Sequence, residues 1–410
     1  MIVSSLPSKR IEEYRAIVGN EVDKILEIGE SLREYSVTHV NSTSFGGGVA
    51  ELLYSIVPLM NNVGLKATWE VIEAPQEFFN ITKKMHNSLQ GAAVDISKEE
   101  KELYLKVNER NANELKLDSS FIVIHDPQPL AVRKFLDNSR KWIWRCHIDL
   151  SNPYKPTWEF VSSLMRGYNA SVYHMKEYIH PEVPTPKTYV IPPSIDPLSE
   201  KNREMSWSEV EKIAERYDVN LEKPIITMVA RFDPWKDPLG AIDIYRLVKE
   251  RIPDIQLLMV ASMAHDDPEG WVYFEKTLRH AGEDSSIHFL TNLVGVGARE
   301  VNAFQRASTV ILQPSTREGF GLAVSEGMWK KKPVVARASG GIKIQVIDGV
   351  TGYFFKNVQD AADKVVYLIK HPEVREKLGL NAYNHVKENF LTTSHLKRYL
   401  EMFRDLVTRN

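Results

Sequence analysis

The sequence contains one cysteine, Cys146, in 410 residues. An intrachain disulfide is therefore excluded, and such a chain is expected in a reducing compartment. The sequence also lacks an excess of one charge, because 52 Lys and Arg residues are balanced by 54 Asp and Glu residues, for a formal net charge of −2. A nearly neutral protein has no general attraction to polyanions, so we expect no nucleic-acid partner and no anionic membrane surface as partner.

Long hydrophobic runs and metal-ligand patterns are missing as well. No window approaches the run of about 18 uncharged apolar residues of a transmembrane helix, and the charged N-terminal stretch is unlike a signal peptide. The alternative of a membrane-touching helix over 8–34 is weakened by its mixture of Glu and Lys. No His-x-x-x-His, cysteine pair or Asp-x-Asp cluster occurs, and the 12 histidines are mostly isolated, which is typical of surface or capping groups. We predict a cytoplasmic protein without a metal site.

Short apolar segments alternate with helical segments, which is typical of a parallel sheet covered on both faces. The expected strands of the first half are 36–40, 66–72, 121–124, 141–146, 171–173 and 189–191, with a helix over 49–63. Those of the second half are 225–229, 255–260, 287–290, 310–312 and 333–336, with a helix over 239–251.

The segment 192–197 (PPSIDP) separates the two halves, since three prolines in six residues form a stiff connector. A chain of this length is also too long for one typical core. We therefore predict an α/β protein with two Rossmann-like, doubly wound domains that face each other across a cleft, over 1–195 and 196–393. The last segment, 394–410, is predicted as a helix that could pack back on the N-terminal domain. Domains of this kind bind ligands at the carboxyl ends of their strands.

Three consecutive glycines, Gly46, Gly47 and Gly48, lie between an expected strand and an expected helix. Glycines there let the backbone approach a ligand closely, and free amides at a helix start attract an oxyanion. The pattern matches neither the dinucleotide-binding glycine motif nor the P-loop. A tight turn without a ligand is the alternative.

Arg231 and Lys236 lie on the loop RFDPWKD, directly after an apolar strand. Two cations at the carboxyl end of a strand can converge on one anion, Arg as a fork and Lys as a point charge. Surface ion pairing with Asp233 and Asp237 is the alternative.

Glu318 and Glu326 lie in the stretch STREGFGLAVSEG, eight positions apart. The glycines between them interrupt any continuous helix, so we place Glu318 on a loop and start a helix near Leu322, with Glu326 in its second turn. Backbone amides at this helix start form a site for a diphosphate, and carboxylates accept hydrogen bonds from sugar hydroxyls. Each glutamate also has an alternative role without a ligand. Glu318 could balance the helix dipole, and Glu326 could be an exposed helix residue paired with Lys330. Lys330–Lys332 is interpreted as a solvated helix end.

Taken in this order, the motifs resemble the retaining family 4 glycosyltransferases, which have the two-domain GT-B fold. The likeness covers essentially the whole chain. Its matching parts are Gly46–Gly48, His147 in RCHID, Arg231 with Lys236, Glu318 with Glu326, and the Gly340–Gly341 turn. The stretches FIVIHDPQP and WIWRCHIDLSNP look like the trehalose-forming subgroup, and within it more like the glycosyltransferring synthases than the retaining phosphorylases.

The resemblance implies a role for each matching residue. Arg231 and Lys236 would bind the donor diphosphate, Glu326 the ribose hydroxyls, and Glu318 the donor glucose near its 3-hydroxyl. Further amides to phosphate and sugar would come from Gly319, Phe320, Gly321 and Leu322. Neither glutamate is assigned as a nucleophile or general base, in contrast to the carboxylate pair of a glycoside hydrolase.

In the N-terminal half, the resemblance places His147 near the glucose 6-hydroxyl. Arg231, Lys236, His147 and Glu318 are thus the expected catalytic residues, and we place His125 and Asp126 beside the acceptor. Three positions depart from the usual family pattern. Gly327 replaces an alanine, Lys332 a glycine, and Asn292 a glycine near the nucleobase.

The implied reaction moves glucose from a nucleoside diphosphate glucose, such as UDP-, ADP- or GDP-glucose, to glucose, and forms trehalose reversibly. No tightly bound cofactor is expected, although Mg²⁺ could accompany the diphosphate. The expected partners are these small molecules, and a homodimer stays open. The alternatives are a retaining trehalose phosphorylase, a GT-B nucleotide-sugar epimerase and a non-catalytic sugar-binding protein.

Overall fold

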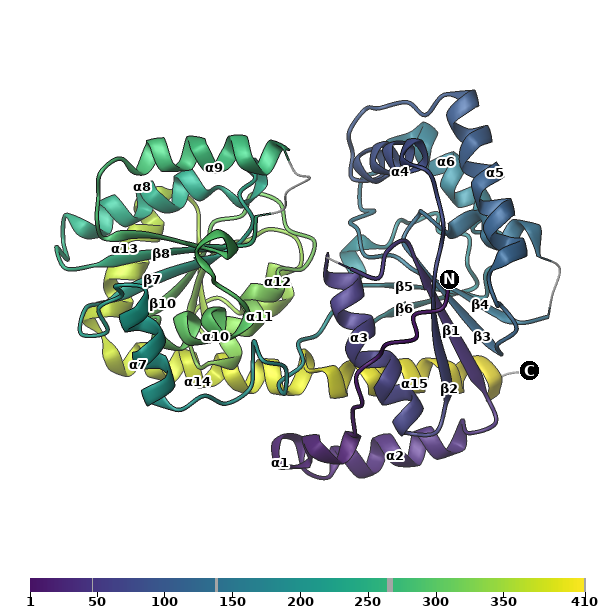
Figure 1. Cartoon of the computed structure of the whole chain (residues 1–410), viewed down its shortest axis with the longest axis horizontal. Coiled ribbons are helices and arrows are strands. Elements are labelled where there is room, and N and C mark those ends of the chain that lie inside the picture. Colours follow the sequence, from purple (N-terminus) through teal and green to yellow (C-terminus); the bar gives the residue numbers. More distant parts are fainter. Residues whose placement is uncertain (46, 137–138, 264–267, 409–410) are drawn as a thin grey trace. The chain divides into compact units, whose positions relative to one another are not determined.

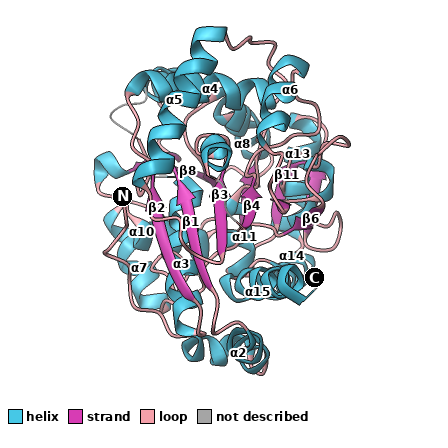
Figure 2. Ribbon diagram, turned by 90° about the vertical axis from the view of Figure 1, so that its right-hand side faces the viewer, coloured by secondary structure: helices cyan, strands magenta, loops and turns pink. Residues whose placement is uncertain are grey.

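The computed structural model describes residues 1–45, 47–136, 139–263 and 268–408. The chain divides into two compact units, Met1–Ser194 with Thr392–Asn410, and Ile195–Leu391. Each unit contains a six-stranded parallel sheet with helices on its faces (Figures 1 and 2). The predicted fold class, two doubly wound α/β domains, is confirmed.

The sheet of the first unit has the strand order β2-β1-β3-β4-β5-β6. The strands are β1 Ser36–Asn41, β2 Lys66–Val71, β3 Phe121–His125, β4 Lys141–Arg145, β5 Ala170–Tyr173 and β6 Lys187–Val190. The strand order reverses between β1 and β3, since β2 lies on one side of β1 and β3 on the other. In open α/β sheets a ligand crevice lies at such a switch point, outside the carboxyl ends of the strands.

Two hydrophobic cores cover the faces of this sheet, because successive side chains of a strand point to opposite faces. Phe121 and Val123 belong to one core, and Ile122 and Ile124 to the other. The described helices of four or more residues are α1 Arg15–Val18, α2 Glu21–Ser31, α3 Gly47–Asn62, α4 Gln76–Leu89, α5 Lys98–Glu114, α6 Lys155–Leu164 and α15 Thr392–Thr408, besides the 3-10 turns Ile11–Tyr14 and Leu130–Phe135.

The terminal helix α15 belongs to the first unit, although it follows the second unit in sequence. Leu396, Leu400 and Phe403 are buried in the same core as α2 and α3. The ring of Phe403 stacks on that of Phe121 in β3, with centroids 4.5 Å apart. The domain boundaries of the structure lie within two residues of those expected from the sequence.

The second unit has the strand order β12-β11-β10-β7-β8-β9. Its strands are β7 Ile225–Val229, β8 Gln256–Ala261, β9 Ile287–Thr291, β10 Val310–Gln313, β11 Val334–Arg337 and β12 Gly352–Phe355. Its described helices are α7 Trp207–Arg216, α8 Pro238–Lys249, α9 Pro268–Ala281, α10 Ala298–Ala307, α11 Leu322–Trp329, α12 Ile342–Gln345, α13 Val358–Lys370 and α14 Pro372–Asn389. The switch point lies between β7 and β10, the two strands that precede the Arg231–Lys236 loop and the Glu318 loop.

The sequence patterns missed one strand. β12 is an edge strand of only four residues, GYFF, with half-buried central residues, and its short aromatic run was not recognised as a strand. The strand expected at 189–191 is β6, which begins two residues earlier, at Lys187.

Candidate functional site

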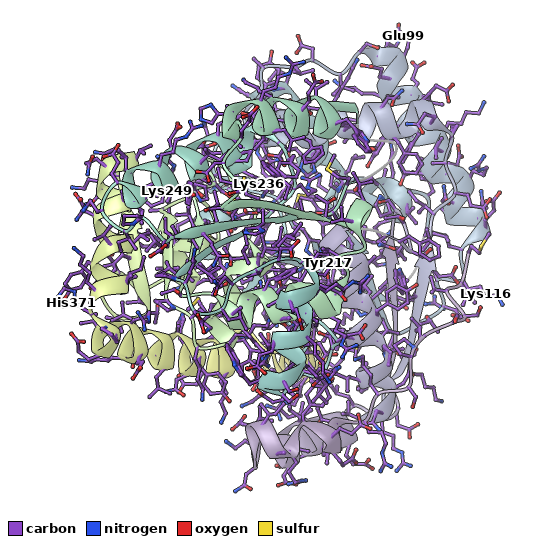
Figure 3. The ribbon with its side chains drawn as sticks, turned by 60° about the vertical axis from the view of Figure 1, so that its left-hand side comes forward. Glu99, Lys116, Tyr217, Lys236, Lys249 and His371 are labelled. Atoms are coloured by element: carbon purple, nitrogen blue, oxygen red, sulfur yellow. The ribbon has the colours of Figure 1, made fainter. Side chains whose placement is uncertain are left out.

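The loop after β7 brings Lys236 to Glu318. Asp233 accepts a hydrogen bond from the backbone N–H of Lys236 and so forms the 3-10 turn Pro234–Lys236. Nζ of Lys236 then lies 2.7 Å from both carboxylate oxygens of Glu318, and the two side chains are only 16% and 10% exposed. Figure 3 labels Lys236 on this loop. The predicted diphosphate cation and the first glutamate thus form one ion pair.

Arg231 has a different environment. Its guanidinium is 70% exposed and lies 3.5 Å from the carboxylate of Asp233. The alternative of surface ion pairing with Asp233 and Asp237 therefore holds for Arg231, which lies beside Asp233. It does not hold for Lys236, which pairs with Glu318, and the carboxylate of Asp237 instead accepts a hydrogen bond from Arg337 at 3.4 Å. That Arg231 and Lys236 converge on one anion stays a prediction. The guanidinium of Arg231 is exposed and therefore accessible to such an anion.

The Glu318 loop is held in its turn by close contacts. Glu318 accepts a second hydrogen bond from the hydroxyl of Ser315 at 3.3 Å. Gly321 has φ +84°, a left-handed conformation that favours glycine, and a Cβ added there would lie 3.0 Å from Cγ of Glu318, so a larger residue would also displace the Glu318 side chain. The helix α11 begins at Leu322, as predicted, with Glu326 in its second turn.

The Gly340–Gly341 turn supports this loop from β11. A Cβ added at Gly341 would lie 2.6 Å from Cα of Phe320, which explains the need for glycine at this position. The amide of Gln345 donates to the backbone carbonyl of Phe320, and the hydroxyl of Ser339 donates to that of Ser315 at 2.7 Å. Sequence reasoning did not identify Gln345 or Ser339, because their roles depend on backbone contacts that no local pattern marks.

Glu326 is 3% exposed, which corrects the alternative of an exposed helix residue. One carboxylate oxygen lies 3.3 Å from Nζ of Lys201, and the other accepts from the amide of Gln305 at 3.3 Å. Lys330 is also buried, and donates to the backbone carbonyl of Glu326 at 3.2 Å and to Asn202 at 2.9 Å. Burial lowers the pKa of Lys330 to about 7. The interpretation of Lys330–Lys332 as a solvated helix end is therefore wrong for Lys330.

A pocket of about 320 Å³ opens where β7 and β8 end and α10 begins. Its size is at the lower end of the range typical of small-molecule sites. Lys201, Arg231 and Glu326 supply its charged groups, and its other walls are Val229, Ala230, Val260, Ala261, Ser262, Val296, Gly297, Ala298 and Val301. An apolar wall with a carboxylate at its edge suits a nucleobase with its ribose hydroxyls.

Two family departures have structural explanations. A Cβ at Gly327 would lie 2.6 Å from Cγ1 of Ile311, so α11 contacts β10 too closely for the usual alanine. The amide of Asn292 accepts from the backbone N–H of Met263 at 2.7 Å and donates to its carbonyl at 3.0 Å. Asn292 therefore fixes the backbone of Met263, which follows the pocket residues Ala261 and Ser262. The pKa of Lys332 is lowered to about 8 by burial, and nothing in the structure explains its replacement of glycine.

The glycine loop of the first unit is only partly visible. Gly47 and Gly48 form the start of α3, in agreement with the predicted helix start, and Gly46 lies outside the described residues. Ahead of them, the amide of Asn41 donates to the carbonyl of Thr43 at 2.7 Å, and Trp69 donates to Asn41 at 2.7 Å. These bonds order the end of β1, and an oxyanion bound by the glycine loop stays a prediction.

Four histidines of the first unit form a continuous chain of ring-to-ring hydrogen bonds, which we call the four-histidine chain. Nδ1 of His39 lies 2.9 Å from Nε2 of His125, Nδ1 of His125 lies 2.9 Å from Nε2 of His147, and Nδ1 of His147 lies 3.1 Å from Nε2 of His174. The prediction that the histidines are mostly isolated is wrong for these four. It failed because they come from β1, β3 and the loops after β4 and β5, and sequence spacing cannot show that neighbouring strands place them side by side.

Asp126 lies beside this chain and has a left-handed backbone conformation, with φ 63°. Its carboxylate accepts from the backbone N–H of His147 at 2.8 Å, and burial raises its pKa to about 7. Arg145 is fully buried nearby and donates to the carbonyls of Tyr173 and Ile191. The predicted acceptor residues His125 and Asp126 thus lie together with His147 at the carboxyl ends of β3 and β4.

Both ring nitrogens of His147 are engaged by neighbouring imidazoles. A ring nitrogen of His147 therefore reaches the glucose 6-hydroxyl only when the sugar replaces one of these partners, and this contact stays a prediction. Within the described ranges, no group of three or more His, Cys, Asp or Glu side chains is arranged to hold a metal ion. None of the described helices has the length and apolar character needed to cross a membrane.

Two family models match the chain. Residues 39–180 match the model described as trehalose synthase, N-terminal domain, and residues 209–385 match the model for glycosyl transferases group 1. Proteins named trehalose synthase from Pyrococcus horikoshii and Rubrobacter xylanophilus are 54% and 44% identical to this chain, over 97% of both chains in each case. A trehalose phosphorylase from Pleurotus pulmonarius is 25% identical over 84% of this chain and 53% of its own length.

Solved structures agree on the fold. A sucrose-phosphate synthase from Thermosynechococcus elongatus matches 92% of this chain and 100% of its own, with a TM-score of 0.70 and 15% identity. A trehalose 6-phosphate synthase from Burkholderia multivorans matches 91% and 98%, with a TM-score of 0.71 and 14% identity. These likenesses show the fold alone.

Proposed function

The chain belongs to the trehalose synthase family of glycosyltransferases, and from this premise we propose that it transfers glucose from a nucleoside diphosphate glucose to glucose, with trehalose as the reversible product. The observation that carries the proposal is the arrangement in the second unit. The pair Lys236–Glu318 lies before the N-terminus of α11, and Glu326 lines a pocket with apolar walls. This set matches the parts of one ligand, which are a sugar, a diphosphate and a nucleoside.

Cleavage of the donor builds negative charge on the leaving phosphate and positive charge on the glucose ring. Lys236, Arg231 and the amides at the start of α11 would stabilise the phosphate charge, the largest kind of contribution in such catalysis. In the structure Lys236 forms an ion pair with Glu318. When the donor diphosphate pairs with Lys236, Glu318 can accept a hydrogen bond from a hydroxyl of the donor glucose. One exchange of partners would thus form the contact to the phosphate and the contact to the sugar.

The acceptor step needs no dedicated protein base in this proposal. The leaving phosphate oxygen departs from one face of C1, and the acceptor hydroxyl attacks the same face and gives its proton to that oxygen. A new C1–O bond forms as the old one breaks, and the anomeric configuration is retained. His147, His125 and Asp126 of the first unit would hold a sugar, since imidazole and carboxylate groups bind hydroxyls.

The experiment is an incubation of the protein with glucose and with UDP-, ADP- or GDP-glucose, followed by chromatography for trehalose and for the released nucleoside diphosphate. We expect equal amounts of both products from at least one donor. Absence of trehalose with every donor would leave the family and fold in place and remove the proposed reaction. Release of nucleoside diphosphate without trehalose would indicate a different acceptor or an epimerase-like activity.

A further inference from the structure

Glu326 is a buried carboxylate at the edge of the pocket, and two side chains hold it in place. One carboxylate oxygen lies 3.3 Å from Nζ of Lys201, and the other accepts from the amide of Gln305 at 3.3 Å. A buried carboxylate is stable in its ionised form only when charge pairing and hydrogen bonds replace its contacts with water. The proposed function gives Glu326 a ribose to bind, and gives Lys201 and Gln305 no role.

The amide of Gln305 is directed at this carboxylate. Gln305 is fully buried in α10, and its Oε1 has no hydrogen-bond partner among the residues that the structure describes. The reverse orientation of the amide would place its oxygen against the carboxylate of Glu326. A buried amide oxygen without a partner costs free energy, so an apolar side chain of the same shape would pack here more favourably. The amide of Gln305 therefore serves the carboxylate rather than the packing of α10.

Lys201 is held in place by its two neighbours in sequence. The backbone carbonyl of Glu200 accepts from the amide of Asn302 in α10 at 3.0 Å. The backbone carbonyl of Asn202 accepts from the indole N–H of Trp329, the last residue of α11, at 3.1 Å. Because α10 carries the buried amide and α11 the carboxylate, the backbone around Lys201 is fixed to the helices of both groups.

A second lysine near Glu326, Lys330, has a different environment. It is only 5% exposed, and it donates to the backbone carbonyl of Glu326 and to the side chain of Asn202 rather than to the carboxylate. Lys201, in contrast, lines the pocket, and its side chain is 27% exposed. Of these two lysines, Lys201 is therefore the cation that pairs with the carboxylate where a ligand would bind.

The carboxylate of Glu326 has room for two further hydrogen bonds. An ionised carboxylate has about four lone-pair sites, two on each oxygen. Lys201 and Gln305 take one site on each oxygen, so one site on each stays open among the contacts of the described residues. The 2′ and 3′ hydroxyls of a ribose are neighbouring donors that fit these two sites.

We propose that Lys201 and Gln305 are positioning residues that hold Glu326 for a ribose with two free hydroxyls, so that the pocket selects ribonucleotides over 2′-deoxy and 3′-deoxy nucleotides. The inference rests on the proposed function, because it requires a nucleoside in this pocket. Loss of one hydroxyl removes one hydrogen bond to a charged group, which should weaken binding about tenfold or more.

Isothermal titration calorimetry of the full-length protein tests this selection without reference to turnover. UDP, ADP and GDP are titrated first, and then the 2′-deoxy and 3′-deoxy analogues of the nucleotide that binds most tightly. We expect both analogues to bind the wild type about tenfold or more weakly than the ribonucleotide. Equal Kd values for the ribonucleotide and both analogues would overturn the proposal.

Variants at the two positions test the positioning role. Lys201→Met and Gln305→Met remove the contact to the carboxylate and keep side chains of similar length, whereas Lys201→Arg keeps the cation. We expect the preference for the ribonucleotide to shrink about threefold or more in both methionine variants, because a carboxylate without a fixed orientation bonds the hydroxyls less well, and to return in Lys201→Arg. Lys249→Met is the matched control, since Lys249 pairs with Asp284 outside the pocket, and it should keep the wild-type preference.

Equal weakening of the ribonucleotide and both analogues in Lys201→Met would show that Lys201 only supports the fold, and would refute the positioning role. Tighter binding of the ribonucleotide in Lys201→Met would refute it as well, because Lys201 would then compete with the ribose for Glu326. If Lys201→Met does not fold, the wild-type preference and Gln305→Met decide the question.

The same titrations separate this inference from the proposed function. Trehalose formation by the wild type, with an unchanged preference in the folded methionine variants, would overturn the inference alone. The expected preferences without trehalose from any donor would refute the proposed function and leave the roles of Lys201 and Gln305 standing. A wild-type protein that binds none of the three nucleoside diphosphates would overturn both.

Discussion

Replacement of Lys236 by alanine should affect both stability and turnover, by amounts that follow from its contacts. Nζ lies 2.7 Å from each oxygen of a carboxylate that is only 10% exposed, so the variant leaves Glu318 largely buried without its cation. Removal of one partner from a fully buried pair costs about 3–5 kcal/mol. Glu318 keeps the hydroxyl of Ser315 at 3.3 Å, and the site is partly open to water, so we expect about 1–3 kcal/mol in the free energy of unfolding.

The variant should also lose most of its turnover. A preorganised group that stabilises charge on the leaving phosphate contributes on the order of 10²–10³ in kcat. Initial rates of trehalose formation at saturating donor, together with urea unfolding curves, measure the two effects separately. Lys249→Ala is the matched control, because Lys249 pairs with Asp284 at 2.8 Å on α8, outside the proposed site (Figure 3).

Lys249→Ala should keep the turnover of the wild type within about twofold, since a partly exposed pair contributes roughly 0–1 kcal/mol to stability and nothing to the reaction. Lys236→Ala with unchanged turnover would refute the assignment of Lys236 to the leaving phosphate. A fall of equal size in both variants would show that general loss of stability, rather than lost charge stabilisation, lowers the rate.

Three further predictions concern the ribose site, the packing of α11 and the response to pH. Glu326→Gln should raise the donor KM at least tenfold with a smaller change in kcat, measured by donor titration, and an unchanged KM would contradict the ribose role. Gly327→Ala should cost about 1–3 kcal/mol of unfolding free energy, and Ile311→Val should recover part of that loss in the double variant; additive losses would contradict a direct clash. Below about pH 6.5 the unfolded protein binds protons that the buried rings of the four-histidine chain do not bind, so each ring with a lowered pKa should cost up to about 1.4 kcal/mol per pH unit as pH falls. Asp126, with a folded pKa of about 7, offsets one such ring between roughly pH 4 and 7, and urea unfolding at pH 7.5, 6 and 5 should show a net loss; constant stability would contradict the neutral rings.

The fold was largely predictable because strands buried on both faces leave an unmistakable apolar pattern. β3 and β8 are buried along their whole length, and both were predicted within one residue at each end. The edge strand β12 was missed, because its aromatic run is only three residues long and its centre is half-buried. The start of α11 was also predictable, since the glycines at 319 and 321 interrupt a continuous helix and the helix begins at Leu322.

The partners of the site residues could not be predicted in the same way. Lys236 and Glu318 were identified one by one, but their ion pair joins loops that are 82 positions apart in sequence. Lys201 lies in a connecting segment without a motif, and only the fold places it at Glu326. The four-histidine chain is the largest omission, because each member is an isolated histidine in sequence and the parallel strand order alone brings the rings into contact.

Nucleotide-dependent trehalose cleavage tests the central claim most directly, because the proposed role of the pocket at Glu326 requires that a nucleotide binds there. Trehalose is incubated with the protein and with UDP, ADP, GDP or inorganic phosphate, and the products are separated by chromatography. The account predicts glucose and a nucleoside diphosphate glucose with at least one nucleotide, and no glucose 1-phosphate with phosphate alone. Glucose 1-phosphate from phosphate, with no product from any nucleotide, would contradict it and identify a phosphorylase.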